Sequence, residues 1–373
     1  MIYFDSAATS FQKPPEVAAA VLEAMKTMSS PGRGSHEAAM RAADTVFACR
    51  CALAELFNMK DPSRVVFTMN ATHALNLAIK SLVPPGGRVV ISGYEHNAVT
   101  RPLTALKADV RIAAAPLFQS QGVTDAFERE IKPETNAVIC SHISNVFGFI
   151  QPVEEVARLC RERSVPLIID ASQSAGVLPL DLESLGAAFI AMPGHKGLYG
   201  PQGTGVLLCG NTPLQTLIEG GTGSNSRLQT MPDFLPDRLE AGTHNVPGIA
   251  GLLAGVNYVK ERGMANIFRR ERQLTAFLAE GFREIPGLRV LSLPGLSQQA
   301  GVLSVVSERM DPEELGERLN EQGIALRTGY HCAPLAHHTA GTLGTGTLRL
   351  SVSDFNTAEE ACRCLDAFHA CMP

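Results

Sequence analysis

The chain has 373 residues, of which 45% are hydrophobic and 18% charged, with 33 Gly and 23 Pro scattered along it. This composition excludes disordered, collagen-like and coiled-coil proteins, and the length allows one large domain together with a smaller one. The 32 Lys+Arg against 37 Asp+Glu give a formal net charge of −5 without a basic stripe, which argues against nucleic acid as a partner.

The N-terminus and the cysteines indicate the compartment. Residues 1–5 lack the basic region of a secretory signal, and no run reaches the ~18 apolar residues of a membrane span. We therefore expect a cytoplasmic protein without a membrane segment. The nine Cys are an odd count without zinc-finger spacing, so we expect most of them to be reduced and no structural metal.

In chain order, the pattern first predicts two helices, over residues 14–28 and 37–57. From residue 64 onward, short Val- and Ile-rich runs alternate with helical patterns such as 74–82 and 153–163, which is typical of a parallel α/β sheet. The expected strands are 64–68, 88–92, 110–114, 137–141, 166–170, 187–192 and 204–209.

A change of pattern follows the last of these strands. Residues 220–245 are dense in Gly, Thr, Pro and Asn and predict a long loop. Helices are expected over 248–262, 264–285, 312–322 and 357–368, with strands between them. We predict a large domain over residues 1–255 and a smaller one over 256–373, and this division leaves the N-terminal segment free to pack on the smaller domain.

The glycine-rich run MPGHKGLYGPQGTG, which begins at Met192, holds the first candidate for chemistry. It places Lys196 directly after an apolar strand, where an α/β sheet opens onto its ligand crevice. A lysine desolvated in a pocket becomes an amine nucleophile for a carbonyl, as in the Schiff bases of pyridoxal phosphate. The alternative is a glycine-rich turn with an exposed lysine.

Three further candidates follow other strands at the same sheet edge. Asp170 ends a strand 26 residues before Lys196, and a carboxylate there suits a pyridinium nitrogen; alternatively it caps the next turn. Ala71 and Thr72 begin a helical pattern whose free N–H groups suit a phosphate, although an N-cap Thr explains them as well. His96 follows the next strand and could stack on a planar ring.

Ten stretches carry a resemblance over nearly the whole chain: YFDSAATSFQKP at Tyr3, RGSH at Arg33, FTMNATHALNL at Phe67, EHNA at Glu95, HISNVFG at His142, IDASQS at Ile169, GHKGLYGPQGTG at Gly194, LEAGTHN at Leu239, RTGYHCAP at Arg327 and LRLSVSDFNTAEE at Leu348. The chain resembles the class V aminotransferases of fold-type I pyridoxal-phosphate enzymes, and within them the cysteine desulfurase and selenocysteine lyase branch. The resemblance implies an α/β fold with a large, mostly parallel sheet flanked by helices and a smaller α+β C-terminal domain.

The resemblance also implies roles around the cofactor, pyridoxal 5′-phosphate. Lys196 would form the Schiff base, Asp170 would pair with the pyridine nitrogen, and Gln173 would bond the ring hydroxyl. His96 would stack on the ring and is a candidate proton donor, while Ala71, Thr72 and His195 would hold the phosphate.

Further positions concern the substrate and the assembly. Asn145 would lie beside the substrate and the ring oxygen, and Arg349 would bind the substrate α-carboxylate, with His36 and Arg327 as further substrate-binding candidates. Thr243 matches a position that reaches the phosphate of the partner subunit, which implies a homodimer with shared active sites.

Cys332, in RTGYHCAP, decides the reaction that the resemblance implies, and it stands in a short loop between a strand pattern and a His-rich turn. L-cysteine would become L-alanine and leave its sulfur as a persulfide on Cys332, from which an acceptor protein could take it. We expect neighbouring Arg327 and His331 to lower the thiol pKa. Alternatives are an ordinary loop cysteine or a metal cluster of His331, Cys332, His337 and His338.

Other functions also stay open: a selenocysteine lyase acting on L-selenocysteine, another class V lyase or aminotransferase, or a non-catalytic sulfur or metal carrier. The chain departs from the family at three places. Pro193 replaces a hydroxyl residue, so one phosphate contact is expected to be missing or replaced. His73 stands where an acid is common, and the segment 333–348 differs in length and contains three glycines.

Overall fold

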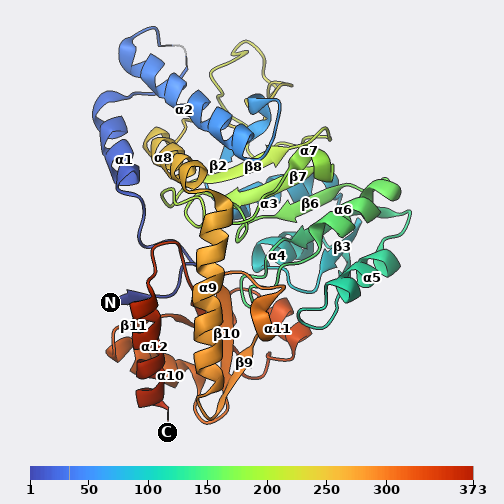
Figure 1. Cartoon of the computed structure of the whole chain (residues 1–373). Coiled ribbons are helices and arrows are strands. Elements are labelled where there is room, and N and C mark those ends of the chain that lie inside the picture. Colours follow the sequence, from blue (N-terminus) through green and yellow to red (C-terminus); the bar gives the residue numbers. More distant parts are fainter. Residues whose placement is uncertain (33, 373) are drawn as a thin grey trace.

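A sheet of seven strands forms the centre of the molecule in a computed structural model that describes residues 1–32 and 34–372 (Figure 1). Each of the seven predicted strands is confirmed to within two residues at either end. In spatial order they are β2 (Val65–Thr68), β8 (Gly205–Cys209), β7 (Phe189–Pro193), β6 (Leu167–Asp170), β5 (Thr135–Ser141), β3 (Arg88–Ser92) and β4 (Asp109–Ala113).

Strand β8 departs from the predicted parallel arrangement. It runs antiparallel to both of its neighbours, β2 and β7, whereas β7, β6, β5, β3 and β4 are mutually parallel. A parallel connection requires a crossover of a dozen or more residues, usually with a helix. The chain between β7 and β8 is only residues 194–204, so it returns beside β7 in the opposite direction.

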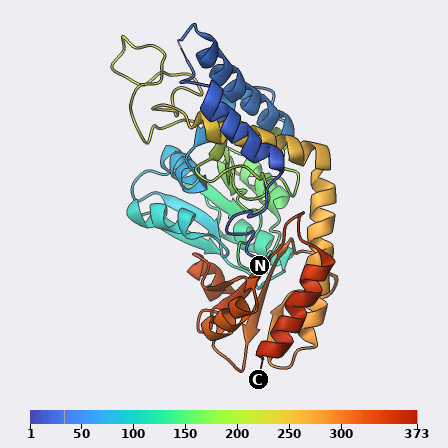
Figure 2. The same cartoon turned by 90° about the vertical axis from the view of Figure 1, so that its left-hand side faces the viewer.

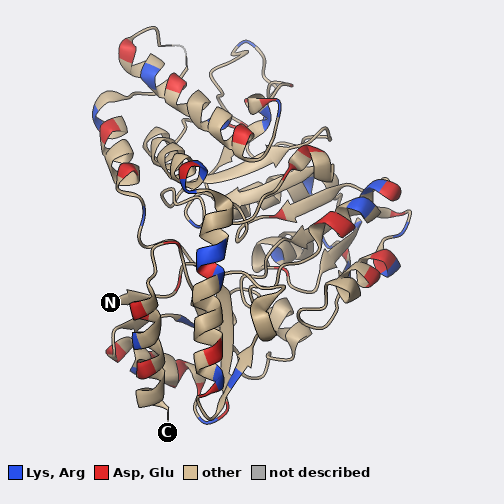
Figure 3. Ribbon diagram, in the orientation of Figure 1, with Lys and Arg blue, Asp and Glu red and all other residues tan. Residues whose placement is uncertain are grey.

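Helices cover both faces of this sheet because its strands are apolar on both sides. Val65 and Val66 are both fully buried, but they belong to different hydrophobic clusters on opposite faces. The charged residues lie mostly on the outer helices and loops, and the strands carry few of them (Figure 3). One face packs on α3 (Ala71–Leu82) and α4 (Asn97–Ala105), and the other on α2 (Glu37–Leu56), α5 (Ser120–Glu130), α6 (Val153–Glu162), α7 (Leu182–Leu185) and α8 (Val246–Arg262).

A second, antiparallel sheet forms the C-terminal layer, below the large sheet in Figure 2. Its order is β12 (Arg327–Gly329), β13 (Thr347–Ser351), β10 (Val302–Ser307) and β9 (Leu288–Leu291). It packs on α9 (Met264–Arg283), α10 (Pro312–Glu321) and α12 (Ala358–Cys371). The N-terminal strand β1 (Ile2–Tyr3) joins this layer by pairing in parallel with β11 (Ile324–Ala325).

Most of the helices expected from the sequence form, including α1 (Pro15–Thr27), α2, α8, α9, α10 and α12. The predicted His-rich turn after Cys332 is instead a helix, α11 (Pro334–Ala340). Proline suits its first position, and Gly341 ends it with a positive φ of 71° that favours glycine. Short 3-10 turns occupy Pro62–Arg64 and Pro294–Leu296.

We propose the division into domains at residues 255 and 256, with β1 attached to the smaller domain. The separate hydrophobic clusters of the two sheets support a division in this region. The chain itself turns at Gly263, between α8 and α9, which lies beyond the proposed boundary, and residues 255 and 256 stand inside α8. Within the described ranges, no helix combines the length and the apolar character that crossing a membrane requires.

Candidate active site

A cavity of about 230 Å³ lies at the carboxyl ends of β3, β5, β6 and β7, beside the start of α3. Ligands of α/β sheets bind at this edge, because successive strands deliver their following loops to one crevice. The structure brings together here eight of the predicted site residues: Ala71, Thr72, His96, Asn145, Asp170, Gln173, His195 and Lys196.

Lys196 and Asp170 reach the cavity from adjacent strands. Asp170 ends β6 opposite Ala191 of the parallel strand β7, and the chain after β7 turns back to present Lys196. Burial lowers the pKa of Lys196 to about 8, against the opposing effect of the Asp170 charge. The amine therefore loses its proton far more readily than an exposed lysine and can act as a nucleophile or base.

The other end of the cavity suits a phosphate. Helix α3 starts there at Ala71, and its first N–H groups have no partner within the helix. Gly205 lets the chain approach closely, since a Cβ on it would lie 2.6 Å from the backbone of Asn70. A helix start, a buried lysine and a buried carboxylate thus line one cavity, and this donor set fits pyridoxal phosphate.

His96 is held as a neutral imidazole. It caps α4, with Nδ1 accepting the Ala98 N–H at 3.0 Å, so the proton lies on Nε2. Burial lowers the pKa of His96 to about 4, and the nearby charge of Asp170 only partly offsets this. At neutral pH this side chain has an N–H to donate but no positive charge.

His195 and Gln173 contact the N-terminal segment as well as the cavity. His195 Nδ1 lies 3.0 Å from Thr9 Oγ1, and burial lowers the pKa of this histidine to about 4. The Gln173 amide donates to the Ala7 carbonyl at 3.0 Å, and among the described residues its side-chain oxygen has no donor, so it can act as an acceptor. The N-terminal segment, which lies outside the large sheet, therefore helps to hold His195 and Gln173 in position.

Cys332 reaches the rim of the cavity on a separate segment. Its carbonyl accepts the Asn97 N–H at 2.8 Å, and Asn145 Nδ2 donates to the His331 carbonyl at 2.8 Å. The thiol is exposed. His331 and Cys332 both have positive φ, 51° and 56°, a strained conformation for side chains of this size that is common at functional sites.

The expected influence of His331 on Cys332 is wrong. His331 is buried, and burial lowers its pKa to about 2, with the Arg349 charge acting in the same direction. The imidazole is therefore neutral and supplies no positive charge to a thiolate. Its Nε2 lies 2.9 Å from Thr347 Oγ1, so the ring supports the segment by packing and hydrogen bonding.

Arg349 lies in β13, just beyond the cavity wall. Its Nη1 donates to the Asn145 carbonyl at 3.0 Å, and its Nη2 contacts Asp5 Oδ1 at 2.5 Å. The neighbouring strand β12 places Arg327 directly across from it, with an exposed side chain. Asn145 therefore links the arginine, the Cys332 segment and the cavity.

Two predicted residues stand apart from this cavity within the chain. Thr243 lines an open cleft of about 600 Å³ between α2 and residues 221–244. His36 caps α2, its Nδ1 accepting the Ala39 N–H, and is exposed. The first residue of the RGSH stretch, Arg33, lies outside the described residues.

Several neighbours of the cavity were not singled out from the sequence. Asn70, Tyr94, Ser141 and Ser172 also line it. Asn70 and Ser172 lie within stretches that carried the resemblance, and Tyr94 and Ser141 directly precede such stretches. Burial raises the pKa of Glu95, beneath the cavity, to about 8, although it accepts hydrogen bonds from Ser92 and Ser141. Only the packing of the sheet shows that these residues lie at or beneath the cavity.

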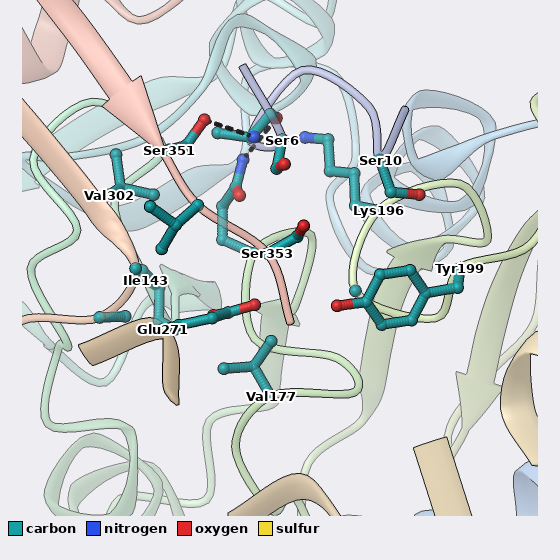
Figure 4. Close-up of a pocket in the computed structure, with 16 residues that line it drawn as sticks. Ser6, Ser10, Ile143, Val177, Lys196, Tyr199, Glu271, Val302, Ser351 and Ser353 are labelled. Carbon is teal, nitrogen blue, oxygen red and sulfur yellow. Dashed lines mark hydrogen bonds between the residues drawn. The ribbon is translucent and has the colours of Figure 1, made fainter. Parts of the chain in front are cut away.

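Lys196 also borders a second cavity on its other side (Figure 4). Ser6, Ser10, Ser351 and Ser353 line this space together with the buried Glu271, whose pKa burial raises to about 8. The two cavities share Ile143, Gln173 and Lys196, so these side chains lie between them.

The structure also locates the residues at which the chain departs from the family pattern. Pro193 lines the lysine cavity, whereas His73 lines a neighbouring cavity of about 160 Å³ together with Thr243. In the part of the chain that the structure describes, no three His, Cys, Asp or Glu residues are grouped to hold a metal, and His331 and His337 each bond a threonine hydroxyl.

Comparison with known proteins agrees with this geometry. The Aminotransferase class-V family profile matches residues 2–363. A probable cysteine desulfurase of Methanothermobacter thermautotrophicus is 33% identical over 96% of this chain and 92% of its own. Among solved structures, a cysteine desulfurase of Thermococcus onnurineus NA1 has a TM-score of 0.90 at 29% identity, covering 99% of this chain and 94% of that one. One from Escherichia coli has a TM-score of 0.85 at 25% identity, with the same coverage.

Proposed function

Because the chain belongs to the class-V aminotransferase family, we propose that it is a pyridoxal-phosphate-dependent cysteine desulfurase that converts L-cysteine to L-alanine. One observation carries this proposal. The segment bearing Cys332 is bonded through Asn97 and Asn145 to the rim of the cavity that contains Lys196. The Lys196 amine can attack a carbonyl and the Cys332 thiol can attack sulfur. Both groups therefore lie where they can act on the same substrate molecule.

The cofactor, when bound, withdraws electrons from the substrate Cα and so makes its proton removable. Lys196 would hold it covalently before the substrate arrives, and Asp170 would keep its ring nitrogen protonated. The start of α3 with His195 would bind its phosphate, and Gln173 would offer a hydrogen bond to its ring oxygen. His96 would pack against the ring.

The chain's own residues then divide the chemistry between them. Lys196, released by the substrate amine and easily deprotonated, removes the Cα proton. The Cys332 thiolate attacks the substrate sulfur; the carbon–sulfur bond breaks, its electron pair stays with the carbon, and Cys332 keeps the sulfur as a persulfide. Cβ, the carbon that lost the sulfur, then takes up a proton, for which His96 Nε2–H is the candidate, and the proton that Lys196 removed is returned to Cα to give alanine.

The substrate would be oriented by its α-carboxylate. Arg349 presents a planar fork of N–H donors that matches a carboxylate, and Asn145 lies between this arginine and the cavity. The exposed Arg327 adds positive charge on the neighbouring strand.

We further propose a homodimer in which His36 and Thr243 contribute to the partner subunit's site. The large exposed apolar side chains Met40 and Phe47 on α2, and Ile218, Leu228 and Phe234 on the long loop, support this arrangement. Phe47 lines the open cleft that Thr243 also lines, and a second copy would cover these apolar side chains. A sulfur-acceptor protein would then take the persulfide from exposed Cys332.

The test is alanine formation from L-cysteine by the purified, pyridoxal-phosphate-loaded protein, with sulfide counted in parallel. Equal amounts of alanine and sulfide are expected in the presence of a reductant, and in a sample without reductant the Cys332 peptide should carry one added sulfur by mass spectrometry. A protein that binds the cofactor but forms no alanine would remove cysteine as the substrate, and L-selenocysteine would then be tested. Keto-acid production would identify a transaminase instead.

A further inference from the structure

The Arg349 side chain has an unfilled hydrogen-bonding position. The side chain is only 2% exposed, and its guanidinium donates from Nη1 to the Asn145 carbonyl and from Nη2 to one oxygen of Asp5. Its Nε is buried and has no hydrogen-bond partner among the described residues. An unpaired buried N–H of a charged group is costly, so this position calls for an acceptor.

The unpaired Nε and the Nη2 that Asp5 contacts are neighbouring donors of one guanidinium. Nε–H and one N–H of Nη2 point in parallel and form a fork that a carboxylate fills with both of its oxygens. Asp5 contacts Nη2 through Oδ1 at 2.5 Å, and among the described residues Nε has no hydrogen-bond partner. It therefore half-fills a position that is shaped for a complete carboxylate.

The backbone around Asp5 is fixed, but its side chain is not enclosed. Asp5 forms a β-bridge with Ser351, and Ala7 N donates to Ser351 Oγ at 2.8 Å, so the segment lies against β13 (Figure 4). The Asp5 side chain nevertheless keeps 19% of its surface exposed. A rotation of this side chain alone would free Arg349 without moving the strand.

The surrounding charges require an anion at this place. Arg327 lies directly across the strand pair from Arg349, and the positive charges of both arginines lower the pKa of Lys196, whereas the Asp5 charge raises it. A buried arginine that loses its carboxylate partner is strongly destabilised. Asp5 can therefore leave Arg349 only when another anion replaces it.

We propose that Asp5 occupies the substrate carboxylate position in the free protein and is displaced by the α-carboxylate of L-cysteine, which bonds both Nε and Nη2 of Arg349. This inference rests on the proposed function for the identity of the substrate. The exchange makes Asp5 a specificity-determining residue. A thiol compound without a carboxylate cannot displace Asp5, so Arg349 stays bonded to Asp5 and does not bind that compound. It also weakens substrate binding by the free energy of the Asp5 contact.

Two substitutions of Asp5 shift the Michaelis constant in opposite directions. Asp5→Asn keeps the shape and the acceptor oxygen but removes the charge, so KM for L-cysteine should fall by about tenfold, as expected when a charged hydrogen bond no longer competes, with a smaller change in kcat. Asp5→Glu adds a methylene that lets both oxygens reach the fork, so KM should rise. If both variants raise KM, Asp5 only positions Arg349 and the proposal is overturned.

A measurement without turnover separates this proposal from the proposed activity. Propionate should raise the melting temperature of the cofactor-loaded Asp5→Asn protein by several degrees, should affect the wild type much less, and propionamide should affect neither. If propionate acts in this way but no alanine forms from L-cysteine, Arg349 still binds a carboxylate that competes with Asp5, and only L-cysteine is rejected as the substrate. Equal stabilisation of the wild type and Asp5→Asn by propionate would overturn the proposal even if desulfuration is found. If Asp5→Asn does not fold, a KM for Asp5→Glu equal to or below that of the wild type overturns it.

Discussion

The cavity around Lys196 and the segment around Cys332 are built from different kinds of structure. The cavity is assembled at the ends of buried parallel strands, so Asp170 and Lys196 are placed by the ladder between β6 and β7. Cys332 instead lies between the short strand β12 and helix α11, with strained backbone and an exposed thiol.

The two regions suit two different tasks, cofactor binding in the Lys196 cavity and sulfur delivery by the Cys332 segment. Binding a cofactor requires groups that do not move, because its orientation controls the reaction. Delivering sulfur requires a thiol that can meet the substrate inside and an acceptor outside. The hydrogen bonds from Asn97 and Asn145 to the Cys332 segment link the two regions directly. Each prediction below tests whether the two regions can be disabled separately.

The largest effect is expected from Lys196→Ala. Removing the amine takes away both the covalent attachment of the cofactor and the base, and the loss of the base alone costs roughly 10²- to 10⁴-fold in rate. The visible absorbance of the lysine-bound cofactor should disappear together with alanine formation. Lys13→Ala is the matched control, because burial also lowers the pKa of Lys13 to about 8 although it donates to Ser10 instead. Survival of the absorbance in Lys196→Ala would contradict the assignment.

Cys332→Ala should abolish sulfur transfer from L-cysteine and leave the cofactor absorbance unchanged, since the thiol lies outside the cofactor cavity. Alanine, sulfide and the spectrum are measured together. Cys362→Ala, which removes another exposed cysteine, is the control. Full desulfurase turnover by Cys332→Ala would reject its role, and loss of the cofactor would show that the two regions are not separable.

A smaller effect concerns acid stability beneath Cys332. His337 is fully buried, and burial lowers its pKa from 6.5 to about 4. As the pH falls below 6.5, the unfolded chain binds a proton that the folded one does not bind until about pH 4, so the folded state loses up to about 1.4 kcal/mol per pH unit.

His337→Gln should therefore reduce the acid loss of unfolding free energy, measured by denaturant titration at pH 7 and pH 5. Buried Glu95 and Glu271, with pKa raised to about 8, act in the opposite direction, because the folded state binds their protons first. The comparison of variant with wild type removes that contribution. His369→Gln changes an exposed histidine and should leave the acid loss as in the wild type; an equal effect of both variants would contradict the prediction.

The smallest effect is expected at the phosphate end of the cavity. Pro193→Ser supplies a hydroxyl where the chain has none and should tighten pyridoxal phosphate binding by roughly three- to tenfold, the gain from one ordinary hydrogen bond. The dissociation constant is measured by titrating the cofactor into the apo protein. Pro193→Ala is the control, and equal affinities of the two variants would mean that the contact is already supplied by other groups.

Much of this architecture could be predicted because its signals are local. Apolar runs with turn residues at their ends located all seven strands of the large sheet. The direction of β8 could not be predicted in this way, because it depends on the length of the connection rather than on the strand itself. Helix α11 was taken for a turn because seven residues with two histidines give a weak helical pattern.

The candidate site likewise has features that local sequence predicts and features that it does not. Lys196, Asp170 and His96 follow strands, and the sheet edge collects such positions whatever lies between them. The neutral state of His331 and the contact between Arg349 and Asp5 could not be predicted, since burial and a contact across 344 positions of the chain decide them.

The sequence by itself determined the strand order along the chain, the family and the residues that carry amine and thiol chemistry, because each of these is a property of neighbouring positions. Only the tertiary structure decided which groups are charged, which donors lack an acceptor and which carboxylate lies on Arg349. These properties depend on how much water reaches an atom and which distant side chain approaches it, and packing alone sets both.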